Sequence, residues 1–155
     1  MSNVEAFQDA MPGNHCWGCG TLNAQGLRIK SRWEGEEAVC RLTPDARFSG
    51  GSTAVVYGGL LAAVMGCHAV GTATAAAFRA EGRPMDSEPP ITFVNASLKV
   101  DFLKPAPMGG PLEVRARVSE LHARKALVAV RVLSGDVECA RGEVVAVRLR
   151  EPRRG

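Results

Sequence analysis

The spacing of apolar and polar residues along the chain predicts an antiparallel sheet made in two parts. Two short runs at 26–33 and 36–42 alternate on either side of the turn-like sequence 34–36, a pattern typical of a β-hairpin. Four longer alternating runs, separated by turn-forming residues, follow in the second half of the chain, at 92–103, 111–121, 124–133 and 137–150.

The two groups of strands are separated by a segment with no charged residue between Phe48 and Phe78. Its composition predicts a helix from about Gly58 to about Arg79. A helix that is uncharged on every side is typically buried inside a protein. A membrane span is not expected, because the segment is mostly Ala, Gly and Thr and holds few large apolar residues.

This order of strands, helix and strands predicts an α+β fold with one antiparallel sheet and one central helix. We expect a single domain over residues 1–155, with 1–25 as an N-terminal loop segment and 150–155 as a flexible tail. A flat sheet would leave one side of such a helix bare, so the sheet must curl around it or a partner must cover it. Either arrangement favours a homodimer.

The glycines of the predicted helix, at positions 58, 59, 66 and 71, each lower helix propensity by about 1 kcal/mol relative to alanine. They indicate places where the helix backbone comes close to the sheet or to a ligand. Gly58 and Gly59 stand where the helix begins, and the first amides of a helix lack intrahelical partners and lie at its positive dipole end. A carbonyl oxygen placed there would be stabilised as negative charge develops on it.

Composition and charge narrow the class of protein further. The net charge of +3 is small and no basic face is evident, so nucleic acid is not an expected partner. The five cysteines cannot all pair within one chain, and the first residues show no basic and apolar pattern of an export signal. We therefore expect reduced thiols in a cytoplasmic protein.

Several short motifs together resemble a known family, although each alone is loose. The motifs are Phe48-x-Gly50, Tyr57-Gly58-Gly59-Leu60-Leu61-Ala62 at the helix start, Phe102-Leu103-Lys104-Pro105 followed by Gly109-Gly110, and Cys16-Trp17-Gly18-Cys19-Gly20 followed by Asn23 and Gly26-Leu27. In order and spacing they resemble the hotdog-fold acyl-CoA thioesterases, in particular the phenylacetyl-CoA-thioesterase-like branch. The resemblance covers about residues 15–150.

The resemblance implies a sheet wrapped around the long helix and dimers, or dimers of dimers, that join sheets edge to edge. It also implies an acyl-CoA substrate bound at the dimer interface and no cofactor. The usual motif is His-Gly-Gly with an acidic residue about nine positions after the His. In that scheme a helix amide polarises the thioester carbonyl, and the acid attacks it or activates water.

Carried onto this sequence, the resemblance gives a set of candidate site residues. Gly58 and Gly59 would bind the acyl carbonyl, and Tyr57 takes the place of the motif's His. Leu60, Leu61, Val64 and Met65 would line an apolar channel, with Gly66 among the substrate-binding residues. Lys104, Arg124 and Lys125 would form a basic rim for the CoA phosphates.

The sequence departs from the family at the position of the acid, because nine residues after Tyr57 the chain has Gly66 and the helix holds no carboxylate. His68 is the only group of the helix that titrates near neutral pH, so it is a candidate catalytic residue that could replace the acid, as could a residue of the partner chain. It lies, however, about 200° around the helix from Gly66. A buried, hydrogen-bonded His68 and a buried, inert Cys67 are the simpler interpretations. Asp101 is expected on an outward-facing strand position.

Cys16 and Cys19 have the spacing of half a zinc site, but a structural zinc needs four ligands. The other cysteines, Cys40, Cys67 and Cys139, are isolated in predicted strands and helix, so no metal is expected.

Two functions remain open on the sequence alone. The first is an acyl-CoA thioesterase, and the second is a non-catalytic acyl-CoA or small-ligand binding protein that has lost the catalytic acid. A lyase on the same fold is less supported, because it needs a His and an acid in the site.

Overall fold

The computed structural model describes residues 5–150, and the tail expected to be flexible lies almost wholly outside the described residues. The described chain contains one helix, six strands and two short 3-10 helices. They are, in chain order, η1 (Phe7–Ala10), β1 (Ser31–Glu34), β2 (Glu37–Leu42), η2 (Ala46–Phe48), α1 (Gly58–Ala80), β3 (Phe93–Phe102), β4 (Leu112–Leu121), β5 (Lys125–Ser134) and β6 (Val137–Arg148).

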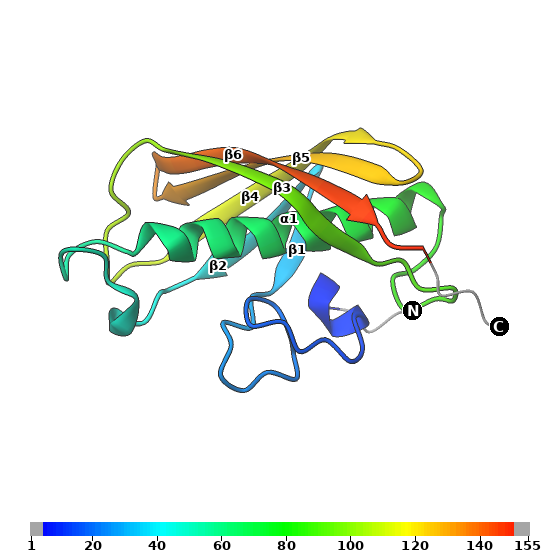
Figure 1. Cartoon of the computed structure of the whole chain (residues 1–155), viewed down its shortest axis with the longest axis horizontal. Coiled ribbons are helices and arrows are strands. Elements are labelled where there is room, and N and C mark those ends of the chain that lie inside the picture. The colour runs from blue at the N-terminus through cyan, green and yellow to red at the C-terminus, as the bar shows by residue number, and fades with distance from the viewer. Residues whose placement is uncertain (1–4, 151–155) are drawn as a thin grey trace.

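The six strands form one antiparallel sheet in the order β1-β2-β4-β5-β6-β3, and α1 runs along the inner side of its curve (Figure 1). The α+β prediction of a sheet wrapped around one long helix is therefore confirmed. β1 and β3 are the two edges of the sheet. β3 follows α1 in sequence but pairs with β6, the last strand of the chain. The strand directly after the helix therefore forms an edge of the sheet.

The sequence explains where α1 ends. Gly82, with φ +65°, donates its amide hydrogen to the Arg79 carbonyl at 3.1 Å, and Arg83 donates to Phe78 at 3.0 Å. These two bonds form a Schellman motif, in which glycine adopts the left-handed conformation that other residues avoid. Among the described residues α1 is the helix long and apolar enough to span a membrane, but 72% of its most apolar window is buried in the fold, so it is the core helix.

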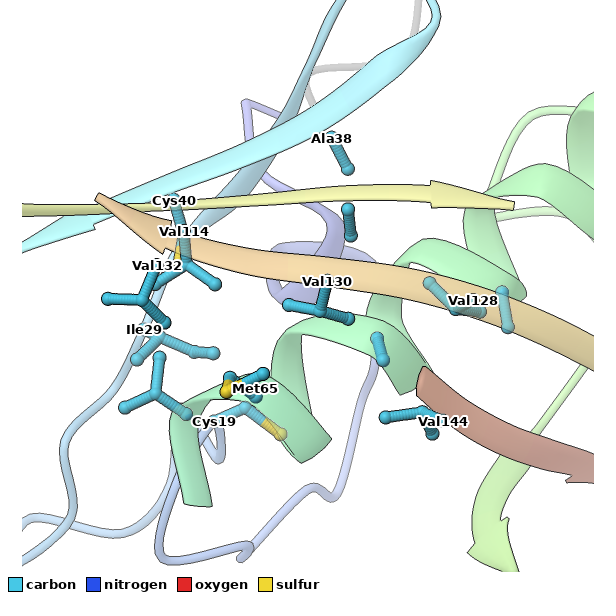
Figure 2. Packing of buried hydrophobic residues seen from close by; sticks show 14 of the residues in the cluster. Cys19, Ile29, Ala38, Cys40, Met65, Val114, Val128, Val130, Val132 and Val144 are labelled. Carbon is cyan, nitrogen blue, oxygen red and sulfur yellow. The ribbon is translucent and has the colours of Figure 1, made fainter. Parts of the chain in front are cut away.

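The core lies between α1 and the concave face of the sheet. Figure 2 shows Met65 of α1 facing the valines of the sheet, among them Val130 and Val132 of β5. Met65 is fully buried, and Gly142 on β6 lies close to it, where an added Cβ would collide with the Lys99 carbonyl oxygen. Glycine is thus needed in the sheet where the backbone of β3 crosses close to β6.

The N-terminal segment is more ordered than the sequence predicted. It contains η1, and both Phe7 and Gln8 are buried. Gln8 exchanges hydrogen bonds with Ser31, donating from Nε2 to Oγ at 3.0 Å and accepting from the backbone amide at 2.8 Å. The prediction of a loop over the first 25 residues was therefore wrong at residues 7–10, because a polar side chain anchors this part to β1.

A bulge in β3 changes which residues face the helix. The pairing with β6 shifts register between Asn95 and Ser97. Before the shift Phe93 and Asn95 face α1, and after it Val100 packs against the core and Phe102 contacts Gly58. A bulge of this kind inserts one residue and reverses the alternation. It places two regions of the edge strand against two different parts of α1.

Candidate active site

The start of α1 leaves two backbone donors free. Tyr57 is the N-cap residue, and its side chain makes no capping hydrogen bond. The Leu60 amide donates to the Tyr57 carbonyl at 3.0 Å, whereas the amides of Gly58 and Gly59 make no hydrogen bond within residues 5–150. The sequence placed an anion-stabilising pair of amides here, and the structure leaves both of them available.

Two exposed aromatic side chains flank these amides. Phe102 of β3 lies against Gly58, where an added Cβ would be 3.2 Å from its ring, and the Tyr57 ring occupies the space beside Gly59. Phe102 is 58% exposed and Tyr57 is 56% exposed.

Gly66, where the resemblance expects the family's acid, faces Asn95 of β3. A Cβ added to Gly66 would be 3.3 Å from Asn95 Nδ2. The Asn95 amide thus lies directly against Gly66, and a side chain at position 66 would have to displace it by a few tenths of an ångström. Sequence reasoning missed Asn95, because the bulge in β3 turns it toward the helix and no local pattern marks the bulge.

A pocket of about 630 Å³ opens beside Asn95, between α1, the start of β3 and the N-terminal loop. Its wall is mainly apolar, with amide and hydroxyl groups from Asn14, Asn95, Thr74 and Thr92. The helix contributes Cys67, Val70, Gly71, Thr74 and Phe78. Those positions recur every three or four residues and form one helix face, which the sequence does not mark because the helix is uncharged on every side. No carboxylate, lysine, arginine or histidine belongs to this wall as residues 5–150 form it.

Three thiols form a cluster on the same wall. The Sγ atoms of Cys16, Cys19 and Cys67 lie within 4.8 Å of one another, and those of Cys16 and Cys67 are 3.6 Å apart. The prediction that Cys67 is isolated was wrong, because the N-terminal loop folds back onto α1. All three are unpaired thiols.

Two thiols of the cluster shift each other's pKa in opposite directions. Hydrogen bonding from Cys67 is the main cause that lowers the pKa of Cys19 to about 6, and burial opposes it. The hydrogen bond to Cys19, together with burial, raises the pKa of Cys67. The two directions are opposite because a negative charge on one sulfur of a close pair disfavours ionisation of the other.

His68 lies on the opposite side of α1, fully buried beneath β1 and β2. Its Nδ1 accepts from Ser31 Oγ at 2.8 Å, and its Nε2 donates to the Ala38 carbonyl at 3.0 Å. Both ring nitrogens are therefore used in holding the helix to the sheet. The structure favours the interpretation of a buried, hydrogen-bonded histidine over that of a substitute base.

This burial makes the stability of the fold depend on pH. Burial lowers the pKa of His68 from 6.5 to about 4, while the Ala38 carbonyl partly opposes the shift. The unfolded chain therefore binds this proton more tightly than the folded one, and stability present above pH 6.5 is lost as the pH falls toward 4. We expect up to about 3 kcal/mol to be lost in this way.

Urea unfolding of the native chain and of His68→Gln between pH 7 and pH 4 would measure the effect. The variant should be less stable at pH 7 but should show a shallower fall on acidification. Equal slopes in the two proteins would contradict a neutral, buried His68.

The residues expected to line an acyl channel are in the core instead. Their exposed fractions do not exceed 4%, and they pack under the sheet: Leu60, Leu61, Val64 and Met65. Helix periodicity explains this correction, since the pocket face and the sheet face lie on different sides of α1.

The basic residues expected to form one rim are not brought together within one chain. Lys104 follows the end of β3 that touches Gly58, whereas Lys125 pairs with Val147 at the opposite end of the sheet, and Arg124 precedes it. Ten residues of strand separate the two ends by about 30 Å. Asp101 faces outward as predicted, with its carboxylate 3.7 Å from Lys99 Nζ.

The fold and this helix start define a hotdog-type α+β protein, and comparisons with known proteins give the family. The model of the thioesterase superfamily matches residues 53–140. A solved thioesterase superfamily protein from Shewanella loihica is 35% identical, with a TM-score of 0.70, over 92% of this chain and 99% of that one. This chain therefore belongs to the thioesterase superfamily, as its motifs indicated.

More distant structures share the fold. A putative thioesterase described as phenylacetic acid degradation-related, from Ralstonia eutropha, is 18% identical with a TM-score of 0.65, covering 78% of this chain and 85% of that one. The E. coli PaaI protein from the phenylacetic acid degradation operon is 17% identical with a TM-score of 0.64, covering 80% and 81%. A comparison with curated proteins gives no match.

Proposed function

We propose that this protein hydrolyses an acyl-CoA thioester at a site shared between two subunits. The observation that carries the proposal is the open start of α1, where the amides of Gly58 and Gly59 have no acceptor among the described residues. Such donors at the positive end of a helix favour negative charge on a carbonyl oxygen. Membership of the thioesterase superfamily supports a thioester as the substrate class.

A second subunit would complete the site. Gly58 and Gly66 are about 12 Å apart along the helix axis, too far to act on one carbonyl. If the β3 edges of two chains pair antiparallel about residues 97–98, Phe102 of one chain lies beside the partner's Phe93. Because Phe102 contacts Gly58 and Phe93 lines the pocket, the free amides of one chain would then face the partner's pocket.

The pocket supports binding of the acyl end of the substrate. Val70, Phe78 and Ile91 give it an apolar wall, and the Asn95 amide can both donate to and accept from a water molecule. In the reaction this water attacks the carbonyl carbon, the C–S bond breaks, and a carboxylic acid and the coenzyme A thiol are released. The titratable groups of the described wall are the three thiols, so the proton acceptor would be a thiolate or a group of the partner. The unpaired cysteines also support the reducing cytoplasm as the site of action.

The alternative function is binding of an acyl-CoA without hydrolysis. It is favoured by Gly66 at the position where the resemblance expects the family's acid, because the Asn95 amide beside it is neutral and cannot accept the proton of water.

Release of free coenzyme A from a panel of acyl-CoAs tests the two functions. We expect turnover by the native chain, and we expect Gly66→Asp to exceed Gly66→Asn about 10²–10⁴-fold in kcat, the usual contribution of a general base. The asparagine variant is the matched control, because it has the same shape without the charge. Turnover with the aspartate variant alone would overturn the native hydrolase and leave the binding protein.

A further inference from the structure

We propose that Cys16, Cys19 and Cys67 bind one zinc ion, with the fourth coordination position open to the pocket. The three Sγ atoms already lie within 4.8 Å of one another without any ion. A tetrahedral zinc with sulfur ligands at about 2.3 Å sets those sulfurs about 3.8 Å apart. The 3.6 Å between the Sγ atoms of Cys16 and Cys67 is close to that edge length.

The loop that carries two of these ligands is shaped to meet the third. Gly20 donates its amide hydrogen to the Cys16 carbonyl at 2.7 Å, which closes the Cys16–Cys19 turn. An added Cβ at Gly20 would come within 2.5 Å of the Cys16 amide nitrogen, and one at Gly18 would collide with Cys67 Sγ. Glycine therefore stands at the two positions that let this turn close and let it lie against the helix thiol.

A neighbouring donor further suits a thiolate ligand. Asn14 Nδ2 lies 3.5 Å from Cys19 Sγ, and Asn14 Oδ1 accepts from the Cys16 amide at 3.0 Å. Hydrogen bonds of this kind orient ligands around a metal and are as much a part of such sites as the ligands themselves. The side-chain oxygen of Asn14 thus holds the loop backbone at Cys16, and its side-chain nitrogen contacts the Cys19 sulfur.

The fourth position has no protein ligand among the described residues. Cys16 is exposed, and all three thiols belong to the wall of the 630 Å³ pocket. Zinc sites with three protein ligands and an open position hold a water or a ligand atom there. A zinc ion held here would therefore present its exchangeable position to whatever occupies the pocket, whether or not that ligand is hydrolysed.

Metal analysis of the whole chain tests the site without any measurement of hydrolysis. Protein produced in zinc-supplemented medium and purified under reducing conditions without chelators should contain about one equivalent of zinc per chain. After exchange with cobalt, it should show the intense visible bands of a tetrahedral cobalt site and a thiolate-to-cobalt charge-transfer band. Failure of the thioesterase assay would leave these results unchanged, so the two proposals fail separately.

Variants locate the ion. Cys16→Ala, Cys19→Ala and Cys67→Ala should each weaken zinc binding at least about tenfold in competition with a chelator. Cys139→Ala is the control, because its thiol is buried near the Pro105 carbonyl, away from the cluster. If the native chain contained no zinc and showed no cobalt bands, the proposed site would be wrong. It would also be wrong if Cys67→Ala bound zinc with the affinity of the native chain. A Cys16–Cys67 disulfide in place of metal under reducing conditions would also overturn it.

Discussion

Replacing Gly58 by proline should lower kcat for thioester hydrolysis about 10²–10³-fold, because the change removes one amide donor from the helix start. The helix α1 should remain intact. Proline is tolerated at the first position of a helix, where the missing N–H has no intrahelical partner. Tyr57, with φ −57° and ψ 125°, already has the extended conformation that proline requires of the residue before it.

The matched control is Gly58→Ala, which keeps the N–H and adds a Cβ. Both variants press on the exposed Phe102 ring, where that Cβ would lie 3.2 Å from the nearest ring atom. A steric effect alone would therefore slow the two variants alike. Steady-state kinetics with circular dichroism would compare them, and equal kcat values for alanine and proline would contradict a role of this amide.

The sequence was sufficient for the helix and the four late strands, but the strand expected over 26–33 is only Ser31–Glu34. The helix was expected from Gly58 to about Arg79 and runs from Gly58 to Ala80, because an uncharged segment ending before Gly82 is a local signal. The four late strands agree with their predictions to within two residues, because alternation is local as well. The order of the strands in the sheet depends on long-range pairing, such as that of β3 with β6, and was not predicted from the sequence.

In the candidate site, too, the features set by local sequence were predicted, and those set by long-range contacts were not. The free amides of Gly58 and Gly59 follow from the start of a helix, and sequence reasoning found them. The position of Asn95 depends on the bulge in β3, and the thiol cluster depends on the N-terminal loop that folds back over α1. Neither feature produces a periodic pattern in the sequence. Glycine at 66 suggested a missing group, and the structure adds that the Asn95 side chain, from another element, lies against this glycine.

Replacing Leu98 by aspartate should convert a dimer into a monomer and reduce kcat/KM at least about 100-fold. Leu98 lies near the middle of the edge strand β3 and is 40% exposed. If two β3 strands pair about this point, the variant sets two carboxylates close together across the two-fold axis. Like charges opposed at an interface cost several kcal/mol, which corresponds to a loss of at least about 100-fold in association. Hydrolysis should fall with it, because the helix start of one chain would no longer meet the partner's pocket.

Leu121→Asp provides the control, since this leucine at the end of β4 is 37% exposed and lies away from β3. Sedimentation should give the native chain and the control a mass at least twice the 16.4 kDa of one chain, and Leu98→Asp the single-chain mass. If the native chain were a monomer that hydrolysed thioesters, the shared site would be wrong. The amides of Gly58 and Gly59 would then have to act on a carbonyl bound within their own subunit. That carbonyl would lie about 12 Å along the helix axis from Gly66 and the pocket beside it.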